Sequence, residues 1–251
     1  MIINLIVIET SPNTAHVWGL FKQNISLSQL MDSSRVMCFA SKRLGHREVS
    51  FYSEQNGKHE DMIKIAWEIL DKSDVIVHYN GKRFDIPTLN KEFLKYGMKP
   101  PSPYKEVDLL LVAREKFRFP SNKLDYVAKF LGVRGKVKHT GHELWVRCMA
   151  GDNNAWALME RYNKHDVRLL ENVYKALLPW ITKHPNIALY RGTGRPTCTN
   201  CGCEKVQSRG VQHTTTMTYR RYQCSKCGTW MRGRFNVNSK NAGDNSVMRQ
   251  I

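Results

Sequence analysis

The chain has 251 residues, of which 41% are hydrophobic, which is enough for one sizeable α/β domain and a small additional module. Its formal net charge of +17 indicates a polyanionic partner, and nucleic acid is the default candidate. No apolar run approaches the length of a membrane span, and no basic segment precedes the short apolar N-terminus. We therefore expect no membrane partner and no signal peptide, and a cytoplasmic location.

Positive charge and cysteines both concentrate toward the C-terminus. From residue 187 onward the chain carries eleven Lys and Arg against two Asp and Glu, a net +9. Five of the seven cysteines lie between Cys198 and Cys227, which indicates a metal site rather than disulfides in a reducing compartment. Cys38 and Cys148 lie in apolar surroundings, so we expect them to be small core residues.

Strands and helices alternate along the first part of the chain. Residues 2–8 are almost all apolar and mostly β-branched, which is typical of a central strand covered on both faces. Further strands are predicted at residues 14–20, 35–42 and 48–52, as an antiparallel meander, and at residues 74–78. Helical spacing of apolar residues predicts helices at residues 59–70, 84–96, 122–131, 143–148 and 155–178, and residues 107–117 begin as a strand and continue as a helix.

These elements predict the domain organisation. The fold class is α/β, a mixed sheet flanked by helices over residues 1–185, followed by a small C-terminal module. Residues 186–196 form the predicted linker, residues 197–235 the cysteine module, and residues 236–251 a basic tail predicted to be disordered. Residues 132–141 are basic and contain glycine, so we predict a mobile loop there.

Carboxylates occupy distinctive positions in three stretches. Glu9 follows the first strand directly, and a strand exit is a rigid mount for a metal ligand. Asp85 comes after a tight turn at Asn80 and starts a helix, where the helix dipole favours negative charge. Tyr162 and Asp166 are four residues apart and share one helix face. Taken singly, each is as well explained by an ordinary turn, helix-start or core-flanking residue.

Together the three stretches resemble the exonuclease motifs of the DEDD superfamily. The matching sequences are Ile8-Glu9-Thr10, Asn80-Gly81-x-x-Phe84-Asp85-x-Pro87 and Tyr162-x-x-x-Asp166. The resemblance covers residues 1–185, is closest to a ribonuclease H-like exonuclease group of bacteria and phages, and places the chain in the Tyr subclass. It implies a ribonuclease H-like fold and hydrolysis of DNA or RNA from the 3′ end, in a bacterial or phage-infected cell.

The resemblance also implies a divalent metal centre. Two Mg²⁺ or Mn²⁺ ions about 3.5–4 Å apart activate the attacking water and stabilise charge on the leaving oxygen. Glu9 and Asp166 are the implied ligands of the ion that activates water. Asp85 is the implied outer ligand, acting through water, and the Tyr162 hydroxyl orients the attacking water.

Val7 departs from the family pattern. The first motif of the family is Asp-x-Glu, whereas this chain has Val7-Ile8-Glu9. In the family that aspartate bridges both ions, and valine offers no oxygen, so we expect a loss of several orders of magnitude in rate. Three explanations of Val7 compete: a deliberate inactivating change, a natural loss that leaves a binding protein, and a tolerated variant with residual activity. The intact remaining positions, Tyr162 above all, favour an active parent.

The cysteine module predicts a zinc ribbon. Cys198-Thr-Asn-Cys201-Gly and Cys224-Ser-Lys-Cys227-Gly are two knuckles separated by 22 residues. This spacing predicts a closed, structural Zn²⁺ site with four thiolate ligands, and residues 214–222 between the knuckles are β-prone. Cys203 is the spare cysteine; it could replace Cys201, although the symmetry of the spacing would then be lost.

Basic and aromatic residues provide the candidates for nucleic-acid contact. In the ribbon we expect arginines to bind phosphates and Trp230 to pack around the metal site. The candidates are Trp18, Lys22, Asn80, Lys123, Lys136, Lys138, Arg209, Arg220, Arg221, Arg232 and Arg234. DNA is favoured over RNA as the partner, and the ribbon could also contact a protein.

Three functions are compatible with these residues. The first is a metal-dependent 3′–5′ exonuclease that Val7 impairs. The second is a catalytically retired nucleic-acid-binding protein on a nuclease scaffold. The third is a structure-selective endonuclease, because related folds also cut junctions and flaps.

Overall fold

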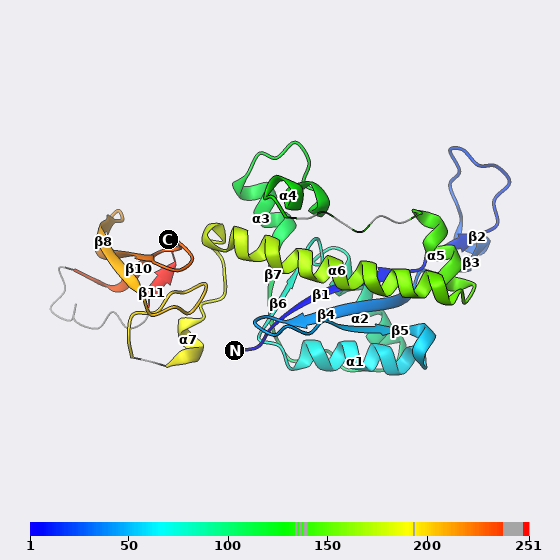
Figure 1. The fold of residues 1–251 in the computed structure, drawn as a ribbon, viewed down its shortest axis with the longest axis horizontal. Coiled ribbons are helices and arrows are strands. Elements are labelled where there is room, and N and C mark those ends of the chain that lie inside the picture. The colour runs from blue at the N-terminus through cyan, green and yellow to red at the C-terminus, as the bar shows by residue number, and fades with distance from the viewer. Residues whose placement is uncertain (134, 136, 138–139, 193, 238–247, 251) are drawn as a thin grey trace. The chain divides into compact units, whose positions relative to one another are not determined.

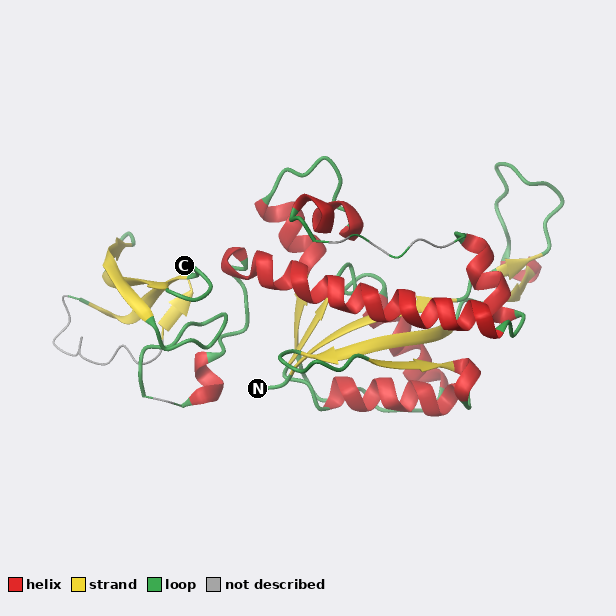
Figure 2. Cartoon of the chain, viewed as in Figure 1, coloured by secondary structure: helices red, strands yellow, loops and turns green. Residues whose placement is uncertain are grey.

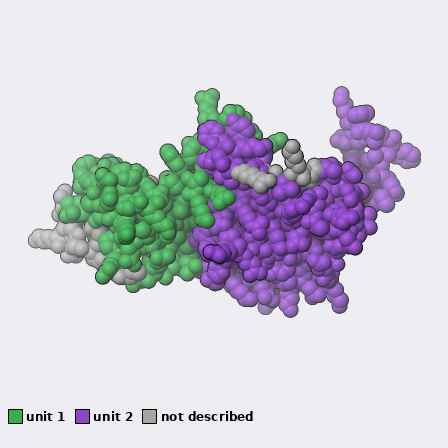
Figure 3. Space-filling view, in the orientation of Figure 1, with its two compact units in different colours: residues 1, 109–123, 172–251 green, residues 2–108, 124–171 purple. Residues whose placement is uncertain are grey.

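The computed structural model describes residues 1–250 except 134, 136, 138–139, 193 and 238–247. The chain forms two compact units: unit 1 is Met1 with residues 109–123 and 172–251, and unit 2 is residues 2–108 and 124–171 (Figure 3). This division does not coincide with the predicted boundary near residue 185, because residues 109–123 and 172–185 group with the C-terminal residues.

Unit 2 is built around a five-stranded mixed sheet (Figure 1). Its strands, in spatial order, are β5 (Ser50–Ser53), β4 (Val36–Arg43), β1 (Ile3–Thr10), β6 (Val75–His78) and β7 (Lys105–Asp108). β1 pairs antiparallel with β4 and parallel with β6. β4 pairs antiparallel with β5, and β6 pairs parallel with β7. The strongly apolar β1 is therefore the central strand, as predicted.

Helices cover both faces of this sheet (Figure 2). The helices that follow the strands of unit 2 are α1 (His59–Asp71), α2 (Asp85–Lys95), α4 (Leu124–Phe130), α5 (His142–Met149) and α6 (Asn153–Leu177). Ile6 and Ile8 of β1 pack against α1 and α2 on one face. Met37 and Cys38 of β4 pack against α5 and α6 on the other. The predicted fold class, a mixed sheet flanked by helices, is confirmed.

The two isolated cysteines are core residues, as predicted. Cys38 is 0% and Cys148 is 2% exposed, and both belong to the cluster between the sheet and α6.

The strand predicted at residues 14–20 is wrong beyond Ala15. β2 (Thr14–Ala15) pairs with β3 (Leu30–Asp32), and the residues between them form a loop. The β-prone sequence predicted a strand, but Trp18 is 99% exposed, so the apolar side chains of this segment have no core to cover.

Unit 1 carries a second, antiparallel sheet. Its strands, in spatial order, are β11 (Met248–Gln250), β10 (Trp230–Asn236), β9 (Thr218–Cys224) and β8 (Val206–His213). The helices of unit 1 include α3 (Leu109–Lys116) and α7 (Ala188–Arg191). Along the whole chain, short 3₁₀ helices are η1 (Leu27–Gln29), η2 (Glu54–Asn56) and η3 (Leu178–Trp180). Among the residues that the structure describes, no helix is both long enough and apolar enough to cross a bilayer.

Short regular elements lie in two C-terminal segments that were predicted as a linker and a disordered tail. The predicted linker, residues 186–196, contains the short helix α7. The predicted disordered tail includes β11, which pairs with β10 and buries Met248 completely. Residues 238–247 and 251 of that tail, and residues 134, 136 and 138–139 of the predicted mobile loop, lie outside the described residues.

A buried ion pair joins β4 to α6. Lys42 Nζ lies 2.7 Å from Glu171 Oε2, and the two side chains are 6% and 9% exposed. Glu171→Leu leaves the Lys42 ammonium buried without its counter-charge, so we expect the free energy of unfolding to fall by about 3–5 kcal/mol. Chemical denaturation measures this loss. The control Glu68→Leu breaks an exposed pair with Lys72 and should cost less than about 1 kcal/mol. Equal losses would contradict the importance of burial.

Candidate active site

One pocket of unit 2 gathers the predicted motif residues. Its volume is about 310 Å³, and Val7, Glu9, Asp85, Tyr162 and Asp166 all line it. The rest of the lining is Ile6, Ile8, Tyr79, Phe84 and Leu124. β1 and β6 run parallel, so their C-terminal ends lie at the same edge of the sheet. Glu9 lies near the end of β1, and the turn that follows β6 lies at that edge too. Residues distant in the sequence therefore meet at a single site.

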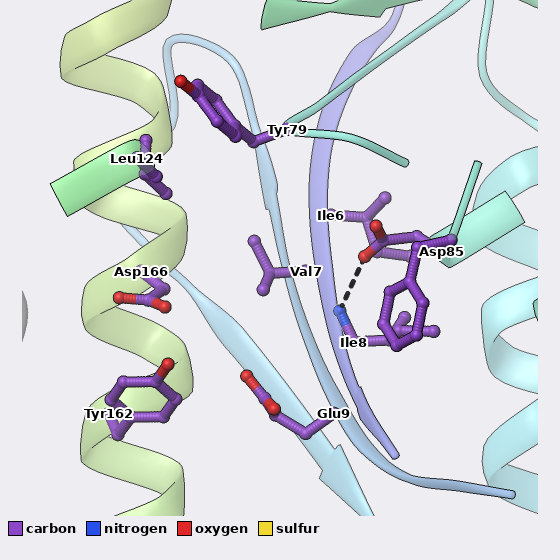
Figure 4. A pocket seen from close by; sticks show the side chains of 10 residues that line it. Ile6, Val7, Ile8, Glu9, Tyr79, Asp85, Leu124, Tyr162 and Asp166 are labelled. Atoms are coloured by element: carbon purple, nitrogen blue, oxygen red, sulfur yellow. Dashed lines mark hydrogen bonds between the residues drawn. The ribbon is translucent and has the colours of Figure 1, made fainter. Parts of the chain in front are cut away.

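The periodicity of β1 and of α6 places the motif side chains of each element on one face. Val7 and Glu9 are two residues apart on β1 and share a face, and Tyr162 and Asp166 share a face of α6. Figure 4 shows Val7 and Glu9 directed toward the side where Tyr162 and Asp166 project from α6. Val7 therefore presents methyl groups on the same face of β1 as the Glu9 carboxylate.

Asp85 is a buried carboxylate of this pocket. It is 6% exposed, and burial raises its pKa to about 6. The Ile8 N–H opposes that increase by donating to Asp85 Oδ1 at 3.1 Å. A nearby divalent cation would favour the ionised form.

A single peptide group of β1 is held from two helices. Asn163 of α6 is completely buried, and its Nδ2 donates to the Val7 carbonyl oxygen at 3.3 Å. The N–H of the same peptide group, that of Ile8, donates to Asp85 at the start of α2. Sequence reasoning missed Asn163, although a polar residue beside Tyr162 on a buried helix face was an available signal. The backbone at position 7 is thus fixed independently of the Val7 side chain.

The donor set fits a divalent cation only in part. Carboxylate oxygens are the ligands that Mg²⁺ and Mn²⁺ prefer, and Glu9, Asp85 and Asp166 supply three of them. Among the described residues, however, ligand atoms of three or more metal-binding side chains lie within 4.8 Å of one another only in a cysteine cluster. The carboxylates share a pocket without converging that closely, and Val7 contributes no ligand.

Comparison with known families matches this fold. A sequence model of the RNase H superfamily matches residues 28–178, more than half of the chain. The chain belongs to the RNase H superfamily. The matched region of this RNase H-like chain contains Asp85, Tyr162 and Asp166, but it begins after Val7 and Glu9. The predicted ribonuclease H-like fold is confirmed.

Comparison with solved structures shows the same fold. The family B DNA polymerase from the hyperthermophilic archaeon Pyrobaculum calidifontis matches with a TM-score of 0.56 and 21% identity. The similarity covers 71% of this chain and 24% of the polymerase chain, so the RNase H-like chain corresponds to a minor part of that protein. A comparison with curated proteins finds no match.

A buried carboxylate shapes the turn before Asp85. Asp108 ends β7, in register with His78, and accepts the Asn80 N–H at 2.9 Å and the Lys82 N–H at 3.3 Å. These bonds support Asn80 at a φ of 69°, a conformation that is uncommon for residues other than glycine. Sequence reasoning missed Asp108, although it is also a carboxylate at a strand exit.

His78 forms the other side of this turn. It is completely buried, and its Nδ1 accepts the Gly81 N–H at 3.1 Å. Nε2 therefore carries the proton and donates to Glu106 Oε2 at 3.0 Å. That hydrogen bond lowers the pKa of Glu106. The turn is thus packed as well as hydrogen-bonded.

Gly81→Ala tests this packing. A Cβ at Gly81 would lie 2.3 Å from His78 Cγ, so the ring or the turn must move. We expect the free energy of unfolding to fall by about 1–3 kcal/mol, measured by chemical denaturation. Gly57→Ala is the control, because nothing lies within 4 Å of the added Cβ, and it should change stability by less than about 0.5 kcal/mol. Equal effects of the two changes would show that the His78 contact is unimportant.

The cysteines of the C-terminal module converge on one point. The ligand atoms of Cys198, Cys201, Cys224 and Cys227 all lie within 4.8 Å of one another. Cys198 Sγ is 3.6 Å from Cys227 Sγ, and Cys201 Sγ is 3.6 Å from Cys224 Sγ. Tetrahedral Zn–S bonds of about 2.3 Å separate sulfurs by about 3.8 Å, so the cluster fits a Zn²⁺ ion. Cys203 is not a member of this group.

The remaining candidates lie on several surfaces. Trp18 and Lys22 lie in the loop between β2 and β3, Asn80 is half-buried in its turn, and Lys123 is exposed in unit 1. Lys136 and Lys138 lie outside the described residues. The ribbon arginines are Arg209 on β8, Arg220 and Arg221 on β9, and Arg232 and Arg234 on β10.

Two ribbon arginines lie over aromatic rings. The Arg221 guanidinium is 4.9 Å from the centre of the Trp230 ring, and that of Arg232 is 4.2 Å from the Tyr219 ring. Trp230 is 38% exposed, and its packing around the metal site stays a prediction. Tyr222, which is half-buried, packs against the cluster of side chains around the cysteines.

Proposed function

We propose that the chain is a metal-dependent 3′–5′ exonuclease of the DEDD type, acting on DNA, whose activity Val7 impairs. The observation that supports this most strongly is the pocket, where Glu9, Asp85, Tyr162 and Asp166 surround Val7. The RNase H-like fold is a scaffold of hydrolytic nucleases that use divalent metals, and a net charge of +17 suits a nucleic-acid substrate.

Each pocket residue has a role in this proposal. Glu9, Asp85 and Asp166 would hold the cations, which supply Lewis acidity and a nucleophilic hydroxide when bound. The Tyr162 hydroxyl orients the attacking water. Burial favours the neutral form of Asp85 below about pH 6, so Asp85 would hold a cation more readily above that pH. Asn163 and Asp85 hold the β1 backbone against which the scissile phosphate would align.

The cysteine module has a separate role. Cys198, Cys201, Cys224 and Cys227 bind a structural Zn²⁺ ion, and the ribbon arginines contact phosphates of the same nucleic acid. The four-thiolate geometry supports the first part of this proposal. Arg209, Arg220 and Arg234, which are exposed on three neighbouring strands, support the second.

A second candidate is a nucleic-acid-binding protein that has lost catalysis. The observation in its favour is Val7 itself, which places methyl groups among the carboxylates. This candidate shares the binding surfaces of the first and differs only in the absence of any hydrolysis.

Trimming of end-labelled strands separates these candidates. The chain and Val7→Asp are incubated with Mn²⁺ and with single strands of DNA or RNA that carry the label at the 5′ end. A ladder shortened one nucleotide at a time from the 3′ end, stronger for Val7→Asp, is the expected result. Binding without cleavage by both proteins would support the second candidate and contradict the first. Internal cuts on branched strands would indicate an endonuclease.

A further inference from the structure

The loop between β2 and β3 exposes an unusual amount of apolar surface. Trp18 is 99%, Leu20 87%, Phe21 85% and Leu27 88% exposed to solvent. Single exposed apolar residues are ordinary, but a group of this size on one loop marks a surface that contacts another molecule.

An ordered stem carries this apolar tip. Ser11 and Arg35 exchange hydrogen bonds of 2.9 and 3.0 Å at the base of the loop. Farther out, the His16 N–H donates to the Gln29 carbonyl at 3.0 Å, and Gln29 Nε2 donates back to the His16 carbonyl at 3.0 Å. Residues 17–28 are therefore the tip of a defined hairpin, here called the apolar tip.

The apolar tip follows β1 at the edge of the sheet where the pocket lies. β1 ends at Thr10, one residue after Glu9, and the hairpin begins directly beyond it. Figure 1 shows the loop that joins β2 and β3 projecting away from the body of unit 2. A substrate that extends from the pocket along this edge would meet the tip.

The charge and ring content of the tip favour nucleic acid. Residues 14–31 contain no Asp or Glu, and their one Lys is Lys22, at a φ of 51° within the tip. Trp18 and Phe21 offer flat rings on which bases stack, and Leu20 and Leu27 are of the kind that wedges between base steps. The absence of negative charge lets a phosphate backbone approach.

We propose that the apolar tip is a strand-separating wedge, which stacks on the last base pair of a duplex and frees the 3′-terminal nucleotide. This inference rests on the proposed exonuclease function, because it supplies that site with its substrate. A pocket of about 310 Å³ has the size of a single nucleotide rather than of a base-paired end. A duplex end must therefore be opened before its 3′ nucleotide enters.

A fluorescence titration without added metal tests the wedge on the chain as it is. A DNA duplex carries 2-aminopurine at one 3′ terminus, and this base brightens when it unstacks and unpairs. The chain, with its zinc site left intact, is expected to increase the fluorescence in buffer without added Mg²⁺ or Mn²⁺. The double variant Trp18→Ala/Phe21→Ala is expected to need about tenfold more protein for half the increase. Leu94→Ala is the control, because Leu94 is 79% exposed on α2 and should leave the titration unchanged.

Trimming in the Val7→Asp background gives a second measurement. There the double change is expected to lower the ratio of duplex trimming to single-strand trimming by about tenfold. An equal fluorescence increase with and without the tip side chains overturns the wedge, whether or not cleavage occurs. The wedge is also overturned if the only effect of the double change is a loss of self-association or a loss of binding to anionic vesicles. A tip-dependent increase without any cleavage by Val7→Asp supports the wedge and rejects the exonuclease.

Discussion

Val7→Asp is expected to raise the rate of Mn²⁺-dependent cleavage by about 10³-fold. The new carboxylate would stand among Glu9, Asp166 and Tyr162 and supply the bridging oxygen that the pocket lacks. A bridging ligand worth about 4 kcal/mol of transition-state stabilisation corresponds to this factor. Single-turnover cleavage of an end-labelled strand measures the rate.

Val7→Asn is the matched control for that change. Asparagine has the size of aspartate without its charge, so we expect its gain to be under about tenfold. Mn²⁺ titration by calorimetry gives an independent measurement, in which Val7→Asp binds more tightly than the original chain. Without added Mn²⁺ the same variant should melt at a lower temperature than the original chain, because a further carboxylate faces Glu9 and Asp166, and Mn²⁺ should reverse the loss. Equal cleavage by the Asp and Asn variants would contradict the role given to position 7.

Cys224→Ser is expected to release the zinc ion and to unfold the C-terminal sheet. Cys224 is 2% exposed, ends β9 and belongs to the core of cysteines, Met231 and Met248. Structural zinc binding contributes about 10–16 kcal/mol in small zinc modules, far more than the few buried side chains of this sheet can replace. Metal analysis of the purified protein and limited proteolysis around residues 197–236 give the two measurements.

Cys203→Ser is the control for the zinc prediction. Cys203 lies two residues beyond Cys201 but outside the group of converging ligand atoms, so its variant should retain one equivalent of zinc and resist proteolysis. Unit 2 should keep its cooperative unfolding transition in both variants, because its core shares no side chain with the cysteine cluster. Zinc loss from Cys203→Ser but not from Cys224→Ser would reverse the ligand assignment.

Local periodicity explains why much of the site was predictable. The two-residue repeat of β1 and the four-residue spacing of Tyr162 and Asp166 fix which side chains share a face, without knowledge of the fold. Glu9 and Asp85 were predictable because strand exits and helix starts have clear sequence signals. The resemblance to a known nuclease family supplied the rest, namely that these separate stretches belong to one site.

Tertiary pairing explains what the sequence did not reveal. Residues 17–20 have the composition of a strand, yet they lie beyond the last residue of β2 that pairs with β3. Met248 lies in a polar tail without apolar periodicity, and it is buried because its strand adds to the edge of β10. Asn163 and Asp108 act on backbone groups distant in the chain, and their local signals, a polar residue on a buried helix face and a carboxylate at a strand exit, do not identify those partners.

The peptide group between Val7 and Ile8 has an evolutionary consequence. Its carbonyl oxygen accepts a hydrogen bond from Asn163, and its N–H donates one to Asp85. A change of the side chain at position 7 therefore leaves these backbone hydrogen bonds in place. Two of the four valine codons, GUU and GUC, differ from an aspartate codon by a single base. Under the proposed function, a lineage that uses either codon would lose or regain hydrolysis by one point mutation, without first having to rebuild its architecture.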